Sequence, residues 1–548
     1  MSDTQEYIVT AKTMNDATSL LDDLETLGGD LYIPDRAVEV TQRREISRNT
    51  HFLLTVEEAE QVRNDPRVLA VELMPSLQGI EALPHWTQTG NFEKSATIDT
   101  NDKNWGLYRS TAGSPLATWG TNGSFSQTTQ TIATTSSGKN VDVIVVDAHI
   151  NFNHPEFAVN IDGTGGSRAI QYDWFQHSTA LGYFTSGIYS YTSISSAHGT
   201  HTAGTTAGNT QGWARDANIY NMEFNYAGGN GPAGDWSTYI FDYIRAFHNA
   251  KPINSATGKR NPTVTNNSWG YSYSNILLSG LTSVTYRGTT TALSGTSAAK
   301  KLILEANGIP VPAGTYLYRS PARSAGVEAD IQDAIADGVI VVASAGNSYW
   351  NCATSDLADY NNNLNGGSYY LTRGSSPGAA DQVICVGSLG TTTQEYKSNF
   401  SNYGKRVDIW ASGSNIVSAV YDANAATEFG ITLADDPRNS AYKLGSISGT
   451  SMSGPQVAGY LACLLEQFPT MKQTAALAHL IANSTTGQIG STGGLAGDYT
   501  SLGDNSNNRY LYYVPIRPLT GSVSPMTRYN NRPTSGVAYP RSRIRRYG

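Results

Sequence analysis

Three side chains in the longer, C-terminal part of the sequence could together activate a hydroxyl group. Asp147 ends the apolar run 141–147, which predicts a buried strand that brings the carboxylate to the carboxyl end of a parallel sheet. His198 opens a segment of small residues, and Ser451 stands where a helix is expected to begin. A carboxylate can orient a histidine that takes a proton from a serine, and the N–H groups at a helix start favour negative charge.

Each of these motifs also has a simpler explanation. Asp147 could cap the turn after its strand, and Ser451 could be an ordinary helix N-cap. Zinc binding by His198 and His201 is disfavoured, because the sequence has no HExxH arrangement and no third ligand there. We expect His201 to be a packing histidine. A lipase-type G-x-S-x-G turn is excluded, because Ser453 occupies the position of the second glycine.

The order Asp147, His198, Ser451 along the chain is that of subtilisin among the known triads. Five sequence blocks resemble the signature blocks of the subtilisin-like serine proteases, the subtilases (peptidase S8 family), in the family's order: VIVVDAHINFNHPEF, HGTHTAGTTAG, NNSWG, VVASAGN and GTSMSGPQVAG. The resemblance covers about residues 104–485. It implies an α/β fold, a three-layer α/β/α arrangement with a mostly parallel sheet, and a serine endopeptidase that works through an acyl-enzyme.

The resemblance also implies a role for each matching residue of the chemical site. Ser451 would be the nucleophile, His198 the general base and then the general acid, and Asp147 the group that holds the imidazole. Asn347 would donate a side-chain N–H to the oxyanion, and the backbone N–H of Ser451 would be the second donor. Gly346 would let a peptide carbonyl approach, because it has no side chain. Without the resemblance, Asn347 is simply part of a Gly-Asn turn.

A further block implies how a peptide substrate would bind. Ser268, Trp269 and Gly270 match the strand that pairs with the substrate backbone and lines the first specificity pocket. Trp269 could instead be an ordinary half-buried aromatic residue.

The chain departs from the family pattern next to two of these blocks. Ala148 and His149 follow the aspartate where the family usually has Ser/Thr-Gly, and Gly454 and Gln456 replace the usual Ser and His after the nucleophile. The span 208–217 is too short for the calcium-binding loop that many secreted subtilisins insert there. We therefore expect no cofactor, and calcium elsewhere is not indicated by a recognisable site.

The charge distribution divides the chain into segments. Residues 1–80 hold 7 Lys/Arg and 15 Asp/Glu, whereas the remainder is balanced. Alternating and helical hydrophobic patterns predict a β-α-β-β-α-β order within 1–80, which is typical of a small ferredoxin-like α+β module. This module resembles the subtilase propeptide, an intramolecular chaperone and inhibitor, so a self-inhibited precursor is expected. We expect a linker with a processing site at 81–104, the protease domain at 105–515, and an Arg/Pro-rich extension at 516–548.

Composition limits the other functions. No stretch approaches the roughly 18 apolar residues of a membrane span, the first ten residues lack the pattern of a signal peptide, and the net charge of −8 disfavours nucleic acid as the main partner. Localisation stays open. The alternative function is a structural or assembly protein, for example of a virus particle, that keeps a subtilase fold as scaffold. Its support is 54 Gly, 32 Tyr, long polar insertions and an arginine-rich arm that could contact an acidic partner.

Overall fold

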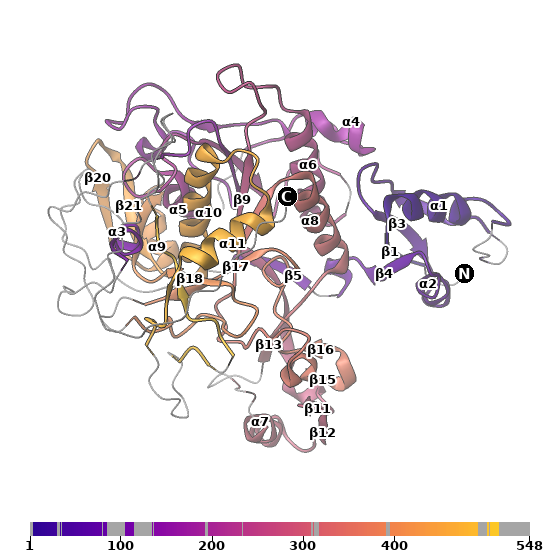
Figure 1. Cartoon of the computed structure of the whole chain (residues 1–548). Coiled ribbons are helices and arrows are strands. Elements are labelled where there is room, and N and C mark those ends of the chain that lie inside the picture. The colour runs from indigo at the N-terminus through magenta and orange to yellow at the C-terminus, as the bar shows by residue number, and fades with distance from the viewer. Residues whose placement is uncertain are drawn as a thin grey trace, which may run out of the picture.

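The computed structural model describes residues 4–29, 33, 36–78, 80–84, 105–113, 134, 136–191, 196–232, 234–307, 309, 311, 317–390, 395–490, 501–503 and 505–514. The predicted extension 516–548 and its expected contact with an acidic partner lie outside the described residues, as does most of the predicted linker. Figure 1 shows a large α/β body with a smaller N-terminal module on one side.

The N-terminal module has the β-α-β-β-α-β order that the sequence predicts. Its elements are β1 (Gln5–Ala11), α1 (Met14–Glu25), β2 (Glu39–Gln42), β3 (Asn49–Leu54), α2 (Val56–Arg63) and β4 (Val68–Leu73). The strands form one sheet in the order β2-β3-β1-β4. A capping box begins α2: the Thr55 side chain accepts the backbone N–H of Glu58, and the Glu58 side chain accepts that of Thr55.

The centre of the body is a nine-stranded sheet in the order β22-β23-β18-β17-β14-β9-β6-β8-β7. Its strands are β6 (Asp142–Asp147), β7 (Ala169–Ile170), β8 (Asn218–Glu223), β9 (Thr263–Asn267), β14 (Ile340–Ser344), β17 (Ile384–Leu389), β18 (Ile409–Ser412), β22 (Thr485–Thr486) and β23 (Arg509–Tyr510). Every pair of neighbours is parallel except β22 and β23. Both faces are covered, which explains the continuous β-branched runs of these strands.

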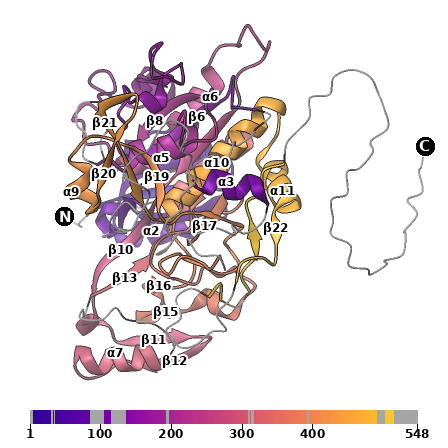
Figure 2. The ribbon, with the colours of Figure 1, turned by 90° about the vertical axis from the view of Figure 1, so that its left-hand side faces the viewer.

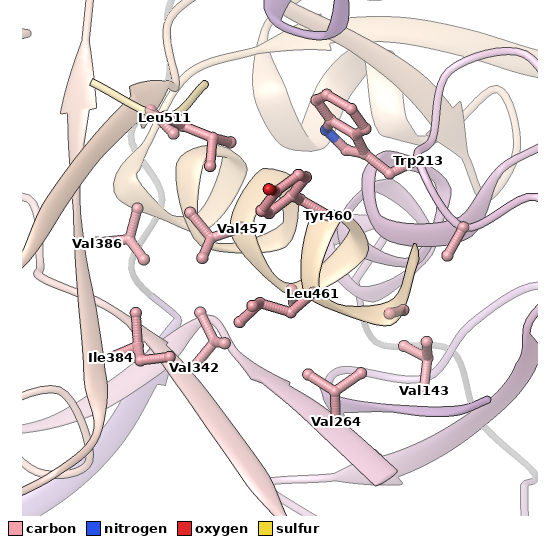
Figure 3. Packing of buried hydrophobic residues seen from close by; sticks show 14 of the residues in the cluster. Val143, Trp213, Val264, Val342, Ile384, Val386, Val457, Tyr460, Leu461 and Leu511 are labelled. Atoms are coloured by element: carbon pink, nitrogen blue, oxygen red, sulfur yellow. The ribbon is translucent and has the colours of Figure 1, made fainter. Parts of the chain in front are cut away.

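Helices form the two outer layers. On one face lie α3 (Trp105–Ala112), α5 (His198–Ala207), α10 (Thr450–Gln467) and α11 (Gln473–Asn483), and on the other α6 (Ile240–Ala250) and α8 (Ala325–Asp337). Figure 3 shows Val457 and Leu461 of α10 above Val264 and Val342 of the sheet. Alternate residues of the same strands point to the opposite layer, where they meet α6 and α8. This is the three-layer α/β/α fold that the resemblance implies.

Three smaller sheets adjoin the central one. The first has the order β13-β10-β5, the second β12-β11-β15-β16 and the third β19-β21-β20. Their strands are β5 (Ile80–Pro84), β10 (Trp269–Leu277), β11 (Ser283–Tyr286), β12 (Thr289–Ala292), β13 (Leu317–Pro321), β15 (Asn363–Leu364), β16 (Tyr369–Tyr370), β19 (Ile416–Val420), β20 (Leu433–Asp436) and β21 (Asn439–Ile447). The remaining α-helices are α4 (Ser178–Leu181), α7 (Ser297–Ala306) and α9 (Ala425–Phe429).

The two longest polar insertions of the sequence, residues 271–325 and 350–378, pack against each other. Strands β11 and β12 and helix α7 come from the first insertion, and β15 and β16 come from the second. They enclose an apolar core of their own that includes Leu281, Val284, Leu304 and Leu364. Figure 2 shows the resulting lobe at the end of β10 and β13.

Candidate active site

The carboxylate of Asp147 and the ring of His198 are in direct contact. Asp147 is the last residue of β6, and His198 is the first residue of α5. His198 Nδ1 lies 2.6 Å from Asp147 Oδ1, and both side chains are buried. The hydroxyl of Thr202 donates to Asp147 Oδ2 at 3.0 Å, and the backbone N–H of Ala148 donates to Oδ1 at 2.7 Å. The carboxylate is thus held on both oxygens and fixes the orientation of the imidazole.

Gly199 allows this contact to form. A Cβ atom at this position would lie 2.1 Å from the carbonyl oxygen of Ala148, which is closer than two such atoms can approach. The glycine of the HGTH motif therefore lets the start of α5 lie directly against the turn after Asp147. The unusual Ala148-His149 pair leaves this turn intact, and the side chain of His149 contacts Glu223 at 3.1 Å.

Ser451 is the second residue of α10, and it is tied to the sheet edge through Ser268. The Ser451 hydroxyl donates to the Ser268 carbonyl at 3.2 Å, and the Ser268 hydroxyl donates to the Ser451 carbonyl at 3.0 Å. Val146 of β6 pairs with Asn267 of β9, so the following residues, Asp147 and Ser268, stand on neighbouring strands at one edge. Neighbouring strands are roughly 5 Å apart, so this edge brings Ser451 near the Asp147–His198 pair.

The amide of Asn347 is oriented by the residue before the nucleophile. Thr450 donates to Asn347 Oδ1 from both its backbone N–H and its hydroxyl, each at 2.8 Å. The Thr450 hydroxyl in turn accepts the backbone N–H of Gly346 at 3.0 Å. Because the oxygen is held in this way, the amide nitrogen points elsewhere. Asn347 Nδ2 is buried, and within the described part of the chain it has no hydrogen-bond partner.

The predicted substrate-binding strand is already paired with a segment of the same chain. Gly270 stands opposite Leu83, and Trp269 stands opposite Pro84, in an antiparallel pairing of β10 with β5. Trp269 is fully buried rather than half-buried, and its ring stacks on Phe224 with centroids 5.8 Å apart. The first residues of the predicted linker are therefore a strand that lies along β10.

The Subtilase family profile matches residues 138–510, which is more than half of the chain. The chain belongs to the subtilase family.

Two relatives and one solved structure illustrate this membership. The subtilase is 24% identical over 357 residues to alkaline serine exoprotease A of Vibrio alginolyticus, covering 65% of this chain and 44% of that protein. It is 26% identical over 421 residues to alkaline protease 2 of Aspergillus fumigatus, covering 77% of this chain and 59% of that protein. The chain thus spans about half the length of these curated relatives.

The crystal structure of fervidolysin from Fervidobacterium pennivorans, a keratinolytic enzyme related to subtilisin, has the same fold. Its TM-score is 0.52 at 16% identity, with 93% of this chain and 60% of that chain covered.

A proline lies inside α10 of the subtilase. Proline favours the first turn of a helix, where no N–H is needed, and the sequence predicts Pro455 there, but α10 begins at Thr450 and Pro455 lies within it. In a regular helix the N–H of residue 455 would donate to the carbonyl of Ser451. Proline has no N–H, and the Ser268 hydroxyl donates to that carbonyl instead. The proline thus leaves the Ser451 carbonyl free to accept the hydrogen bond that ties α10 to the sheet edge.

The second histidine of the HGTH motif and the three cysteines of the subtilase are buried. His201 is buried with Nε2 2.9 Å from the Ile416 carbonyl, and burial lowers its pKa to about 3, as a packing histidine requires. Cys352, Cys385 and Cys463 are all buried and free. Within the described ranges no three His, Cys, Asp or Glu side chains are grouped to hold a metal ion, and no helix has the length and apolar character needed to span a membrane.

Sequence reasoning missed two hydroxyl groups that orient the site. Thr202 contacts Asp147, and Thr450 contacts Asn347. Thr202 lies one helical turn after His198, so the helical period could have pointed to it. Thr450 could not be assigned in this way, because its partner lies 103 residues away in the sequence.

Proposed function

We propose that this subtilase is a serine endopeptidase that hydrolyses protein or peptide substrates with Asp147, His198 and Ser451. The observation that carries the proposal is the 2.6 Å contact between His198 Nδ1 and Asp147 Oδ1, at the sheet edge to which Ser451 is tied. With Nδ1 donating to the carboxylate, Nε2 of the neutral ring is the nitrogen that can accept a proton.

The proposed reaction proceeds in two halves. His198 takes the proton of the Ser451 hydroxyl as this oxygen attacks the peptide carbonyl carbon, and Asp147 stabilises the imidazolium that forms. Asn347 Nδ2 and the backbone N–H of Ser451 donate to the oxyanion, and the positive end of α10 adds to its stabilisation. The imidazolium then protonates the leaving amine. Water, activated by the same histidine, hydrolyses the acyl-enzyme and restores the serine.

We further propose that residues 1–80 inhibit the catalytic unit, 105–515, until the chain is cut between them. The pairing of β5 with β10 supports this, because β10 carries the residues expected to bind the substrate backbone. Tyr271 uses its N–H and carbonyl on the opposite side, with Ser376 and Ala322. Gly270 and Ser272 therefore offer theirs to β5, and Pro84 takes a position that needs no N–H.

The same pairing predicts where the chain is cut. Pro84 ends β5 opposite Trp269, next to Ser268, whose carbonyl accepts the Ser451 hydroxyl. We therefore expect the chain to be cut close after Pro84, and N-terminal sequencing of the C-terminal product should identify the bond.

The test is intact mass and N-terminal sequencing of the freshly made protein beside Ser451→Ala. The wild type is expected to split close after Pro84, whereas the variant stays at full length, because loss of the nucleophile lowers the rate by about six orders of magnitude. A serine-directed fluorophosphonate should label the wild type after removal of the module and should not label the variant. A folded wild-type protein that is neither cut nor labelled would refute the proposal.

The structural or assembly alternative gains no support from the comparisons, because the relatives described above are proteases. Gel filtration distinguishes it: a stable assembly of uncut chains would favour it over the protease.

A further inference from the structure

A buried arginine of the N-terminal module is held between two helices of the body. Arg44 Nε lies 2.9 Å from Asp242 Oδ2 on α6, and Arg44 Nη2 lies 2.5 Å from Asp330 Oδ2 on α8. All three side chains are excluded from solvent. The two carboxylates belong to helices that are separate in sequence, and the guanidinium group joins them.

The groups around this arginine form a built pocket. Arg44 Nη2 also donates to the Thr238 carbonyl at 2.7 Å, Arg44 Nε donates to the Tyr183 hydroxyl at 3.0 Å, and the guanidinium lies over the Tyr239 ring at 5.4 Å. The Tyr183 hydroxyl donates to Asp242, which fixes that carboxylate from the body side. Most of the pocket lining therefore comes from the body, and besides the guanidinium the module adds the Ser47 hydroxyl and the Asn49 amide, which both donate to Asp330.

The charges of the two surfaces are complementary. On the body, α6 and α8 carry Asp242, Asp330, Asp333 and Asp337, with Arg245 bonded to Asp337 at 3.0 Å. The module supplies Arg44 and also Arg48, whose Nε lies 3.2 Å from Asp333. Without the module, four carboxylates would face one arginine, so this surface favours a basic partner.

We infer that Asp242 and Asp330 form a guanidinium-binding site on the catalytic unit, and that Arg44 in this site keeps the module bound after the chain is cut. The inference rests on the proposed function, in which the module is an inhibitor. The acidic partners of Arg44 lie on α6 and α8 and not on β10, so a peptide that displaces β5 leaves the contacts of Arg44 in place. The class of partner that fits is a polypeptide that presents an arginine.

A carboxylate pair of this kind selects arginine over lysine. The guanidinium donates from Nε and Nη2, in fixed directions within one plane, to two different carboxylates, and an ammonium group has no such fixed arrangement of donors. Arg44→Lys should therefore weaken the anchor, although it keeps the charge.

The first experiment uses the uncut Ser451→Ala chain, so it does not depend on catalysis. Hydrogen exchange of α6 and α8 is measured with and without Arg44→Ala. The matched control is Arg43→Ala, because Arg43 is the neighbouring arginine and pairs with Glu25 inside the module. We expect exchange in both helices to rise at least about tenfold for Arg44→Ala and to stay unchanged for Arg43→Ala.

The second experiment uses the cut protein. The rate at which the module leaves is followed by gel filtration and by the recovery of peptide hydrolysis. Truncating one partner of a buried ion pair acts mainly on dissociation, so Arg44→Ala should raise this rate about 30-fold or more. Asp242→Asn changes the pocket from the body side, which keeps the test valid if Arg44→Ala does not fold, and it should act in the same direction.

The two experiments separate this inference from the proposed function. If Arg44→Ala and Asp242→Asn release the module no faster than Arg43→Ala, the inference is overturned even where self-cleavage is normal. If the wild-type chain is never cut, the proposed function fails, and the exchange rates of the uncut chain still decide whether Arg44 anchors the module.

Discussion

Two of the contacts between the N-terminal segment and the body use different chemistry. At β10 the contact is main-chain pairing with β5, whereas at α6 and α8 it is a buried arginine between two carboxylates. Any extended peptide can pair with a strand edge, but only a guanidinium matches the second contact. The comparison indicates that a substrate can replace the first contact and cannot replace the second. An inhibitor held in both ways would leave the cleft before it leaves the enzyme.

The largest effect on activity is expected from a substitution that removes an oxyanion donor and leaves the contacts at β10 and at α6 and α8 in place. Asn347→Ala removes the amide nitrogen that points away from Thr450, and we expect kcat to fall about 100- to 1000-fold with KM unchanged. Self-cleavage should slow to a similar extent, so the uncut chain accumulates with β5 still paired. Steady-state kinetics and the loss of full-length protein over time measure the two effects.

A matched control is Asn160→Ala, because Asn160 lies in an exposed turn where it bonds to Thr164. Equal kcat values for the two variants would exclude Asn347 as an oxyanion donor. Loss of β5 pairing in Asn347→Ala would show instead that the strand contact depends on the site.

A smaller effect is expected from pH at the buried charges. Burial raises the pKa of Asp330 to about 7, although Arg44 opposes this shift and Asp242 adds to it. Asp330 therefore takes up a proton when the module binds. Binding is strongest below the ordinary pKa of an aspartate and weakens as pH rises towards 7. Binding of the module should therefore be weaker at pH 8 than at pH 6.

Other groups at this contact titrate as well, so a variant is needed to isolate Asp330. Burial also raises the pKa of Glu72 of β4, which accepts the backbone N–H of Ala325 at the start of α8, and this shift weakens binding in the same direction. Burial lowers the pKa of His51, which stacks on Tyr239. This shift has the opposite effect, because it strengthens binding of the module as pH rises. Dissociation rates of the wild type and Asp330→Asn at pH 6 and 8 give the difference. Identical pH dependence in both proteins would contradict the prediction.

The smallest effect is expected from the residue that orients Asn347. Thr450→Val removes one of the two hydrogen bonds to Asn347 Oδ1 and also the acceptor of the Gly346 N–H, and it keeps the backbone bond to Asn347. Loss of the side-chain bond to Asn347 corresponds to about a 2- to 10-fold decrease in kcat. Thr206→Val is the control, because its hydroxyl donates within α5 to the Thr202 carbonyl. The rate of module dissociation should be unchanged in both variants. A change for Thr450→Val alone would show that the catalytic site affects how the module is held.

Much of this architecture could be predicted from local sequence patterns. The β-branched runs at 141–147 and 339–343 are strands of the central sheet, and the capping box at Thr55 begins a helix. These features depend on residues within one or two helical turns or on strand burial. The contact of Asp147 with His198 was also expected, because a strand end and a helix start were already assigned to them.

What the sequence left open are contacts between distant residues. Nothing near Arg44 indicates a buried partner 286 residues away, since arginine is usually exposed. The lobe was not predicted either, because each of its two insertions is polar and only their pairing creates an apolar core. The role of Pro455 could not be predicted either, because the Ser268 hydroxyl that bonds to the Ser451 carbonyl lies 183 residues before it.

The separation in sequence between Arg44 and its partner also determines the order in which they are synthesised. Ribosomes add roughly 5–20 residues per second, so the 286 residues between Arg44 and Asp330 correspond to roughly 15–60 s of synthesis. Any folding of the module within that interval takes place without its pocket. Ser451 follows Ser268 by 183 residues and is translated after every other residue of the site. The nucleophile therefore never exists in a nascent chain before the segment that blocks it.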